Sequence, residues 1–149
     1  MAEGSLTLRI ITPDRIVLDT PVTSVRLPGV DGSIGVLKNH APMVAALDIG
    51  TLTYRQNGDV KPIFVSGGFA EVRDNTVRVV SEAGEKAEEI DEARAREAEA
   101  RARKRLDEAQ GSPEQIDVLR AELALRRALA RLETRVHAGH RSSELSHGS

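Results

Sequence analysis

Apolar and polar residues alternate along the first half of the chain, and this spacing changes in the second half. Leu6, Leu8 and Ile10 alternate with polar neighbours, and residues 76–79 repeat the same period of two. That period is typical of strands with one buried face. Apolar or β-branched runs at 22–27, 52–55 and 63–65 predict further short strands.

Turn-forming residues separate these runs at short intervals, at 12–14, 28–29, 31–32, 57–59, 66–68 and 74–75. Asn57-Gly58 fits a two-residue hairpin turn, because both residues adopt positive φ readily. Many short strands with frequent turns predict a β-sandwich or a small barrel. No helix of about ten or more residues fits between the strands, which disfavours a parallel sheet built from βαβ units.

The amino-acid composition changes after Gly84, and residues 88–137 contain ten alanines and ten arginines. Gly111-Ser112-Pro113 is the one interruption in this stretch. Gly111 suits the C′ position of a first helix, Ser112 suits the N-cap of a second, and Pro113 suits its first turn. The pattern therefore predicts two helices joined by a short turn.

The first helix is expected at residues 91–109 and the second at 113–137, and so short a connection makes them an antiparallel hairpin. The polar tail from 139 to 149 is expected to be disordered. Helix one presents a narrow seam of small residues, which comprises Ala95, Ala98, Ala102, Leu106 and Ala109. Alanine buries little area, so the hairpin is expected to be marginally stable.

Helix two carries two apolar stripes, the first of Val118, Leu125, Leu129, Leu132 and Val136 and the second of Ile116, Leu119, Leu123 and Ala130. Between the stripes runs a row of arginines: Arg120, Arg127, Arg131 and Arg135. If the helices pack together, this row and a second one on helix one converge and need anions between them, such as Asp91 and Asp117 or a phosphate chain. Three interpretations stay open at this point: a solvated face, a protein-binding face, or a site for a nucleotide or another anion.

Composition excludes several classes of function. The net charge is −2, made of 9 basic and 10 acidic residues in 1–87 and of 12 basic and 13 acidic residues in 88–149. Neither half is basic and only three residues are aromatic, so nucleic acid is not an expected partner. There is no cysteine, no apolar run long enough to span a membrane, and no signal-peptide pattern at the N-terminus. We expect no direct membrane insertion.

The chain shows no pattern of catalytic residues. His40 is the one histidine of the predicted β-domain and has no metal-ligand spacing around it. The glycines at 29, 32 and 35 lack the Lys-Ser/Thr of a phosphate-binding loop, so turn geometry explains them. We predict that the protein is not an enzyme.

Several motifs occur in a specific order along the β-part. These are Ile11-Thr12-Pro13, Pro28-Gly29-Val30-Asp31-Gly32, Asn39-His40-Ala41-Pro42 and Ser66-Gly67-Gly68-Phe69. The series resembles the epsilon subunits of F-type ATP synthases, whose mitochondrial counterpart is called delta. The resemblance extends from about residue 6 to residue 136.

The resemblance implies a ten-stranded β-sandwich at 1–86, a regulatory α-helical hairpin at 87–138 and a tail at 139–149. It implies a rotor component of the central stalk that couples proton flow to ATP synthesis, with the gamma subunit, the c-ring and the α/β subunits as partners. The location would be the cytoplasmic face of a bacterial plasma membrane or a thylakoid. The hairpin of such a subunit extends toward the α/β subunits and inhibits ATP hydrolysis.

Some bacterial members bind ATP on the folded hairpin through a motif that Ile90-Asp91-Glu92-Ala93-Arg94-Ala95 matches. The resemblance thus implies no required cofactor but a regulatory ATP, bound by Glu85, Ile90, Asp91, Arg94, Ala95, Arg101, Arg127 and Arg131. It places the turn with Asp31, Gly32 and Ser33 toward the c-ring and His40 near gamma. The alternative function is a stand-alone ATP-sensing or protein-binding module without a rotor role.

Overall fold

A computed structural model describes residues 5–109 and 115–147 of the chain. Ten strands come first: β1 (Leu6–Ile11), β2 (Ile16–Val22), β3 (Ser24–Gly29), β4 (Gly32–Leu37), β5 (Met43–Ala46), β6 (Ile49–Gln56), β7 (Asp59–Ser66), β8 (Phe69–Arg73), β9 (Thr76–Val80) and β10 (Gly84–Lys86). A 3-10 turn, η1 (Ala87–Glu89), leads to helices α1 (Glu92–Ala109) and α2 (Gln115–His147).

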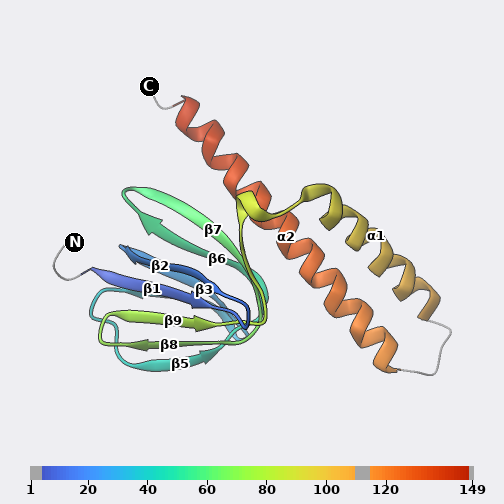
Figure 1. The fold of residues 1–149 in the computed structure, drawn as a ribbon, viewed down its shortest axis with the longest axis horizontal. Helices are drawn as coiled ribbons and strands as arrows, with labels where there is room; N and C mark the ends of the chain where they lie inside the picture. The colour runs from blue at the N-terminus through green and yellow to red at the C-terminus, as the bar shows by residue number, and fades with distance from the viewer. Residues whose placement is uncertain (1–4, 110–114, 148–149) are drawn as a thin grey trace.

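The strands form two five-stranded sheets packed face to face (Figure 1). The first sheet has the order β2-β1-β9-β8-β5 and the second has the order β10-β7-β6-β3-β4. All neighbouring strands in these sheets are antiparallel except β1 and β9, which are parallel. The predicted sandwich is confirmed, and so is the hairpin turn at Asn57 (φ 52°) and Gly58 (φ 81°).

The core lies between the sheets and consists of the inward residues that the alternation predicts. Leu8, Leu27 and Leu52 are fully buried, as are Val77 and Val79. Burial of one such side chain stabilises the fold by about 1.5–3 kcal/mol. All 17 buried members of this core lie between residues 6 and 79, so the hydrophobic core of the sandwich contains no residue of the helices.

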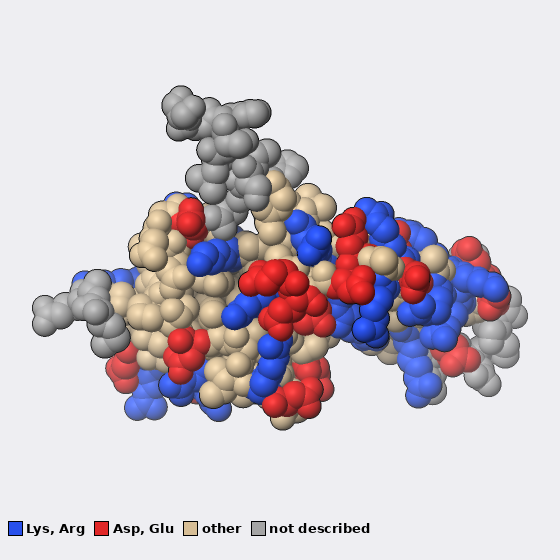
Figure 2. All heavy atoms as spheres, turned by 45° about the horizontal axis from the view of Figure 1, so that its top comes forward, with Lys and Arg blue, Asp and Glu red and all other residues tan. Residues whose placement is uncertain are grey.

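The hairpin lies against the outer face of the second sheet. Helix α2 crosses β6 and β7, and α1 packs along the side of α2 away from the sandwich (Figure 1). The predicted alanine seam is confirmed, because Ala95, Ala102 and Ala109 of α1 are buried. Lys and Arg gather densely over the hairpin with acids between them, whereas uncharged residues dominate the visible sandwich surface (Figure 2).

The second helix differs from its prediction in two ways. It continues through residue 147, so the expected disordered tail from 139 onward is largely helical. No proline follows residue 113, and a single Gly139 within a helix costs only about 1 kcal/mol. Neither predicted apolar stripe faces the sandwich as a unit, because Leu129 and Val136 of the first are 39% and 58% exposed and Leu119 of the second is 55% exposed. The buried positions are the smaller Ala121, Ala128, Ala130 and Thr134, which let the backbones approach closely.

The turn between the helices lies outside the described residues. The predicted roles of Gly111 as C′ residue, Ser112 as N-cap and Pro113 in the first turn therefore stay predictions.

Candidate functional site

A cavity of about 310 Å³ lies where the sandwich, the start of α1 and the middle of α2 meet. Its lining is strongly charged and comprises Glu85, Glu89, Ile90, Asp91, Arg94, Ala95, Ala98, Arg101 and Arg131. Arginines from both helices thus converge on one space, as the arginine rows predict. Seven of the eight residues that the resemblance assigns to ATP line this cavity.

Arg131 of α2 is held in the cavity by an ion pair and an aromatic contact. Its Nε donates to Glu85 Oε2 at 2.8 Å, and its Nη2 donates to Oε1 at 3.3 Å, so that the pair is bidentate. The guanidinium carbon also lies 4.5 Å from the ring centroid of Phe64 on β7. A carboxylate and an aromatic face together fix the orientation of this cation.

Three of the predicted residues have clear structural roles. Asp91 is the N-cap of α1, because its Oδ1 accepts the backbone N–H of Arg94 at 3.2 Å. Ile90 is 4% exposed and packs with Phe64 and Ala130. Ala95 is 4% exposed and belongs to the seam between the helices. These residues shape the cavity and orient α1.

Arg94 and Arg101 have exposed side chains that form no ion pair among the described residues. They lie seven residues apart on α1, which is about two helical turns, so both line the same space. Arg127 does not line the cavity, although it lies one turn before Arg131. The free cations of the cavity therefore come from α1.

Glu89 lines the cavity, although no sequence pattern predicted it. Its Oε2 lies 2.6 Å from Arg15 of the β1–β2 turn, and its Oε1 accepts the N–H of Lys86. Burial alone would raise the pKa of Glu89, but the Lys86 N–H and the Arg15 guanidinium outweigh it and lower the pKa. An arginine that is 74 residues away in sequence thus anchors the root of the hairpin, and no local pattern shows this.

The hairpin rests on the sandwich through a few further polar contacts. The hydroxyls of Thr134 on α2 and Thr51 on β6 lie 2.9 Å apart, and Thr134 also donates to the carbonyl of Ala130. Arg126 forms an ion pair with Asp48, which precedes β6. The two contacts between the hairpin and the sandwich join residues 83 and 78 positions apart, so no local sequence pattern predicts them.

The predicted interface residues occupy opposite ends of β4. Asp31, Gly32 and Ser33 are exposed at the β3–β4 turn. His40 follows the other end of β4 and is partly buried, with its Nδ1 2.7 Å from the carbonyl oxygen of Ala41. The six residues of β4 separate the two places by roughly 17–20 Å.

The outer face of the first sheet presents an apolar row that sequence patterns did not reveal. Register places Ala46, Phe69, Val80, Ile11 and Ile16 side by side across all five strands. Phe69 is 41% exposed and Ile16 is 61% exposed, with Val44 beside the row at 71%. An exposed apolar row that crosses a whole sheet is a candidate surface for a protein–protein contact.

The described residues contain neither a metal-binding cluster nor a membrane-spanning helix. No cluster of three or more His, Cys, Asp or Glu side chains there could hold a metal ion. Within the same residues, no helix combines the length and the apolar character needed to cross a membrane.

Comparison with known families gives two consecutive matches. The model of the "ATP synthase, Delta/Epsilon chain, beta-sandwich domain" matches residues 5–87. The model of the "ATP synthase, Delta/Epsilon chain, long alpha-helix domain" matches residues 88–134. Together the two matches cover nearly the whole chain.

Individual relatives agree with the family matches. The ATP synthase epsilon chain of Nitratidesulfovibrio vulgaris (strain DP4) is 50% identical over 136 residues, which are 91% of this chain and 99% of that one. The epsilon chain of Symbiobacterium thermophilum is 54% identical over 133 residues, 89% of this chain and 92% of that one.

Solved structures show the same fold. A chain in the cryo-EM structure of the Euglena gracilis mitochondrial ATP synthase, which comprises OSCP, F1 and the c-ring, has a TM-score of 0.75 and 28% identity, covering 90% of this chain and 82% of that chain. A chain of the Tetrahymena thermophila central stalk and c-ring shares the fold at a TM-score of 0.57 and 14% identity, over 91% of this chain and 99% of that one.

Proposed function

Because this chain belongs to the ATP synthase delta/epsilon chain family, as a non-catalytic subunit of that complex, we propose that it is a rotor component whose helical hairpin restrains ATP hydrolysis. In this role the sandwich binds the gamma subunit and the c-ring, and proton flow is coupled to ATP synthesis through the central stalk. The location that follows is the cytoplasmic face of a bacterial plasma membrane or a thylakoid.

The apolar row on the first sheet supports a stalk contact. Phe69, Ile16 and Val44 leave a large apolar surface that a partner such as gamma would cover. The hairpin lies on the opposite sheet, so it leaves this row free. The exposed β3–β4 turn with Asp31, Gly32 and Ser33 offers a separate, polar contact that suits the c-ring.

The observation that carries the regulatory proposal is the incomplete docking of the hairpin. Among the described residues, the buried apolar cluster between the start of the hairpin and the sandwich is small: it consists of Phe64, Ile90 and Ala130, with Ile49 and Ala83 packed at its edge. Leu129 and Val136 of α2 stay exposed, so the helix keeps apolar side chains for a second position. Elements held by so few buried contacts open at low free energy, which lets the hairpin extend toward the α/β subunits.

Removing the hairpin tests this function. We expect a chain that ends after Ala87 to assemble into the complex and to raise its ATPase rate several-fold, because the sandwich core contains no hairpin residue. The measurement is ATP hydrolysis per assembled complex, with the subunit content of each preparation determined in parallel. An unchanged rate at full occupancy contradicts the restraint, and a failure of the truncated chain to bind contradicts docking through the sandwich.

The charged cavity favours a second, regulatory function, the binding of ATP. Arg94 and Arg101 supply two guanidinium groups without acidic partners, and Arg131 adds a third if it exchanges Glu85 for phosphate. Guanidinium groups bind phosphate oxygens in a bidentate manner. Bound ATP would join α1 to α2 and the sandwich and hold the hairpin in its docked position.

Calorimetry on the isolated full chain tests this site. We expect Arg94→Ala and Arg101→Ala each to weaken ATP binding about ten-fold, since a hydrogen bond to a charged group contributes roughly 1.5–3 kcal/mol. Arg96→Ala is the matched control, because Arg96 is on the same helix and pairs with Glu92 outside the cavity. The absence of binding at millimolar ATP, or equal losses in all three variants, contradicts the site and leaves the stalk role untouched.

A further inference from the structure

One edge of the sandwich lacks the features that usually protect sheet edges. Strands β2 and β5 end the first sheet, and β10 and β4 end the second. Strand β2 contains Pro21, whereas β5 and β10 have only four and three residues. Strand β4 has six residues and contains neither proline nor a charged residue. Short length, proline and charge are the usual means of preventing strand addition, so β4 is the open edge of the described strands.

The outward groups of β4 follow from its register. The two-residue turn at 30–31 makes Gly29 and Gly32 a hydrogen-bonded pair, and such pairs alternate along an antiparallel ladder. Ser33, Gly35 and Leu37 therefore direct their N–H and C=O groups away from β3. The Leu37 carbonyl accepts a hydrogen bond from the N–H of His40. The N–H and C=O groups of Ser33 and Gly35 and the N–H of Leu37 therefore remain for an added strand.

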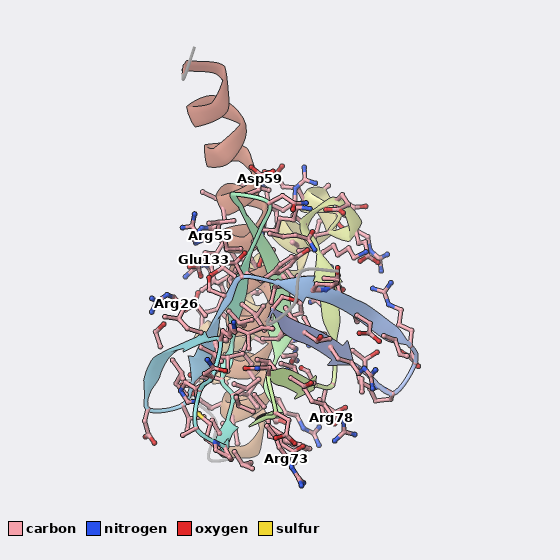
Figure 3. The ribbon with its side chains drawn as sticks, turned by 90° about the vertical axis from the view of Figure 1, so that its left-hand side faces the viewer. Arg26, Arg55, Asp59, Arg73, Arg78 and Glu133 are labelled. Carbon is pink, nitrogen blue, oxygen red and sulfur yellow. The ribbon has the colours of Figure 1, made fainter. Side chains whose placement is uncertain are left out.

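Two of these residues, Gly35 and Leu37, border a basic groove of about 330 Å³ on the outer face of the sheet. Arg26 lies across β4, since a Cβ at Gly35 would come within 3.6 Å of its Nη2, and its Nη1 donates to Ser33 Oγ at 3.1 Å. Arg55 on β6 is diagonal to Arg26, because it pairs with Ser24 in register. Figure 3 shows Arg26 and Arg55 on the same side of the molecule.

The groove has positive charge and an apolar end. Neither Arg26 nor Arg55 forms an ion pair within the part of the chain that the structure describes. Leu37, at the end of β4, is 65% exposed. Because Gly35 has no side chain, the guanidinium of Arg26 lies close to its backbone beside the free edge, within reach of an added chain.

We propose that β4 receives an extended acidic segment of a partner polypeptide as an added strand. The main-chain groups of Ser33 and Gly35 supply the hydrogen bonds, as in other cases of strand addition. The two arginines bind carboxylates on alternate residues of the added strand. A second copy of this chain fits less well, because edge-to-edge pairing would bring two Arg26 side chains together without an acid. The edge lies apart from the apolar row and from the hairpin cavity, so the inference does not depend on the regulation of hydrolysis.

A peptide titration of the ¹⁵N-labelled full chain tests the proposal. The probe is a capped octapeptide of alternating glutamate and threonine, and its control has glutamine in place of glutamate. We expect the acidic peptide to shift and protect the amides of residues 33, 35 and 37, with those of 34 and 36 changed least. Binding of the glutamine peptide should be at least ten-fold weaker.

Two charge reversals complete the design. Arg26→Glu should weaken binding of the acidic peptide at least ten-fold. Arg73 lies on β8 of the other sheet (Figure 3), so Arg73→Glu should leave the affinity for this peptide unchanged. Both side chains are exposed, so both variants are expected to fold. Equal binding of the two peptides, an equal effect of the two variants, or no change at the β4 amides at millimolar peptide would each overturn the proposal.

Discussion

Replacing Gly68 by alanine is expected to destabilise the sandwich by about 2–6 kcal/mol. Gly68 has φ +94°, which is costly for residues with a side chain. A Cβ there would lie 1.9 Å from the carbonyl oxygen of Val80 and 2.9 Å from Ser81 Cα. Backbone strain contributes about 1–3 kcal/mol, and moving the neighbouring strand contributes about 1–3 more.

Urea unfolding of the full chain measures this effect, and Gly67→Ala is its matched control. Gly67 also has positive φ, +74°, but the nearest atom to its added Cβ is a carbonyl oxygen at an ordinary 3.7 Å. Gly67→Ala should therefore lower the free energy of unfolding only by the cost of positive φ, about 1–2 kcal/mol. If both variants lose the same stability, the close approach of Gly68 to Val80 does not determine the turn.

Replacing Phe64 by alanine is expected to release the hairpin from the sandwich. Phe64 is fully buried on the outer face of β7, where it contacts Ile90 and Ala130 and supports the Arg131 guanidinium. Removing a buried phenylalanine costs about 3–5 kcal/mol, and here the loss falls on hairpin docking. Under the proposed function, a released hairpin strengthens the restraint on ATP hydrolysis, so the complex should hydrolyse ATP more slowly.

A distance probe between α2 and the sandwich measures the release, and Leu52→Ala is the control. Leu52 is equally buried but belongs to the core between the sheets. Its variant should lower the stability of the sandwich to urea without separating the hairpin from it. A Phe64→Ala chain that keeps its hairpin docked would show that the ion pairs of Arg131 and Arg126 suffice for docking.

The sandwich was predictable because its strands are short, amphipathic and separated by turns that local residues determine. The alternation around Leu6, Leu8 and Ile10 holds in the structure, as does the turn at Asn57 and Gly58. The motif at residues 66–69, which carried much of the resemblance, has a structural explanation, because only glycine fits against Val80 at position 68. Helix α1 begins one residue later than predicted because Asp91 serves as its N-cap.

The cavity was predictable in part, because an arginine row along a helix shows which side chains share a face. Such a row does not show how far each side chain reaches from the sheet beneath it. Arg131 therefore lines the cavity and Arg127 does not, although both belong to the same row.

Local patterns by themselves determined the two sheets' inward faces, the two helices and the family. The tertiary structure alone decided what the hairpin rests on and which surfaces stay free. The contacts of Arg15 with Glu89 and of Thr51 with Thr134 join residues 74 and 83 positions apart. The apolar row from Ala46 to Ile16 and the open edge of β4 likewise exist only once the strands are in register. Pairing between distant segments depends on the packing of the whole chain, and a local hydrophobic pattern does not encode it.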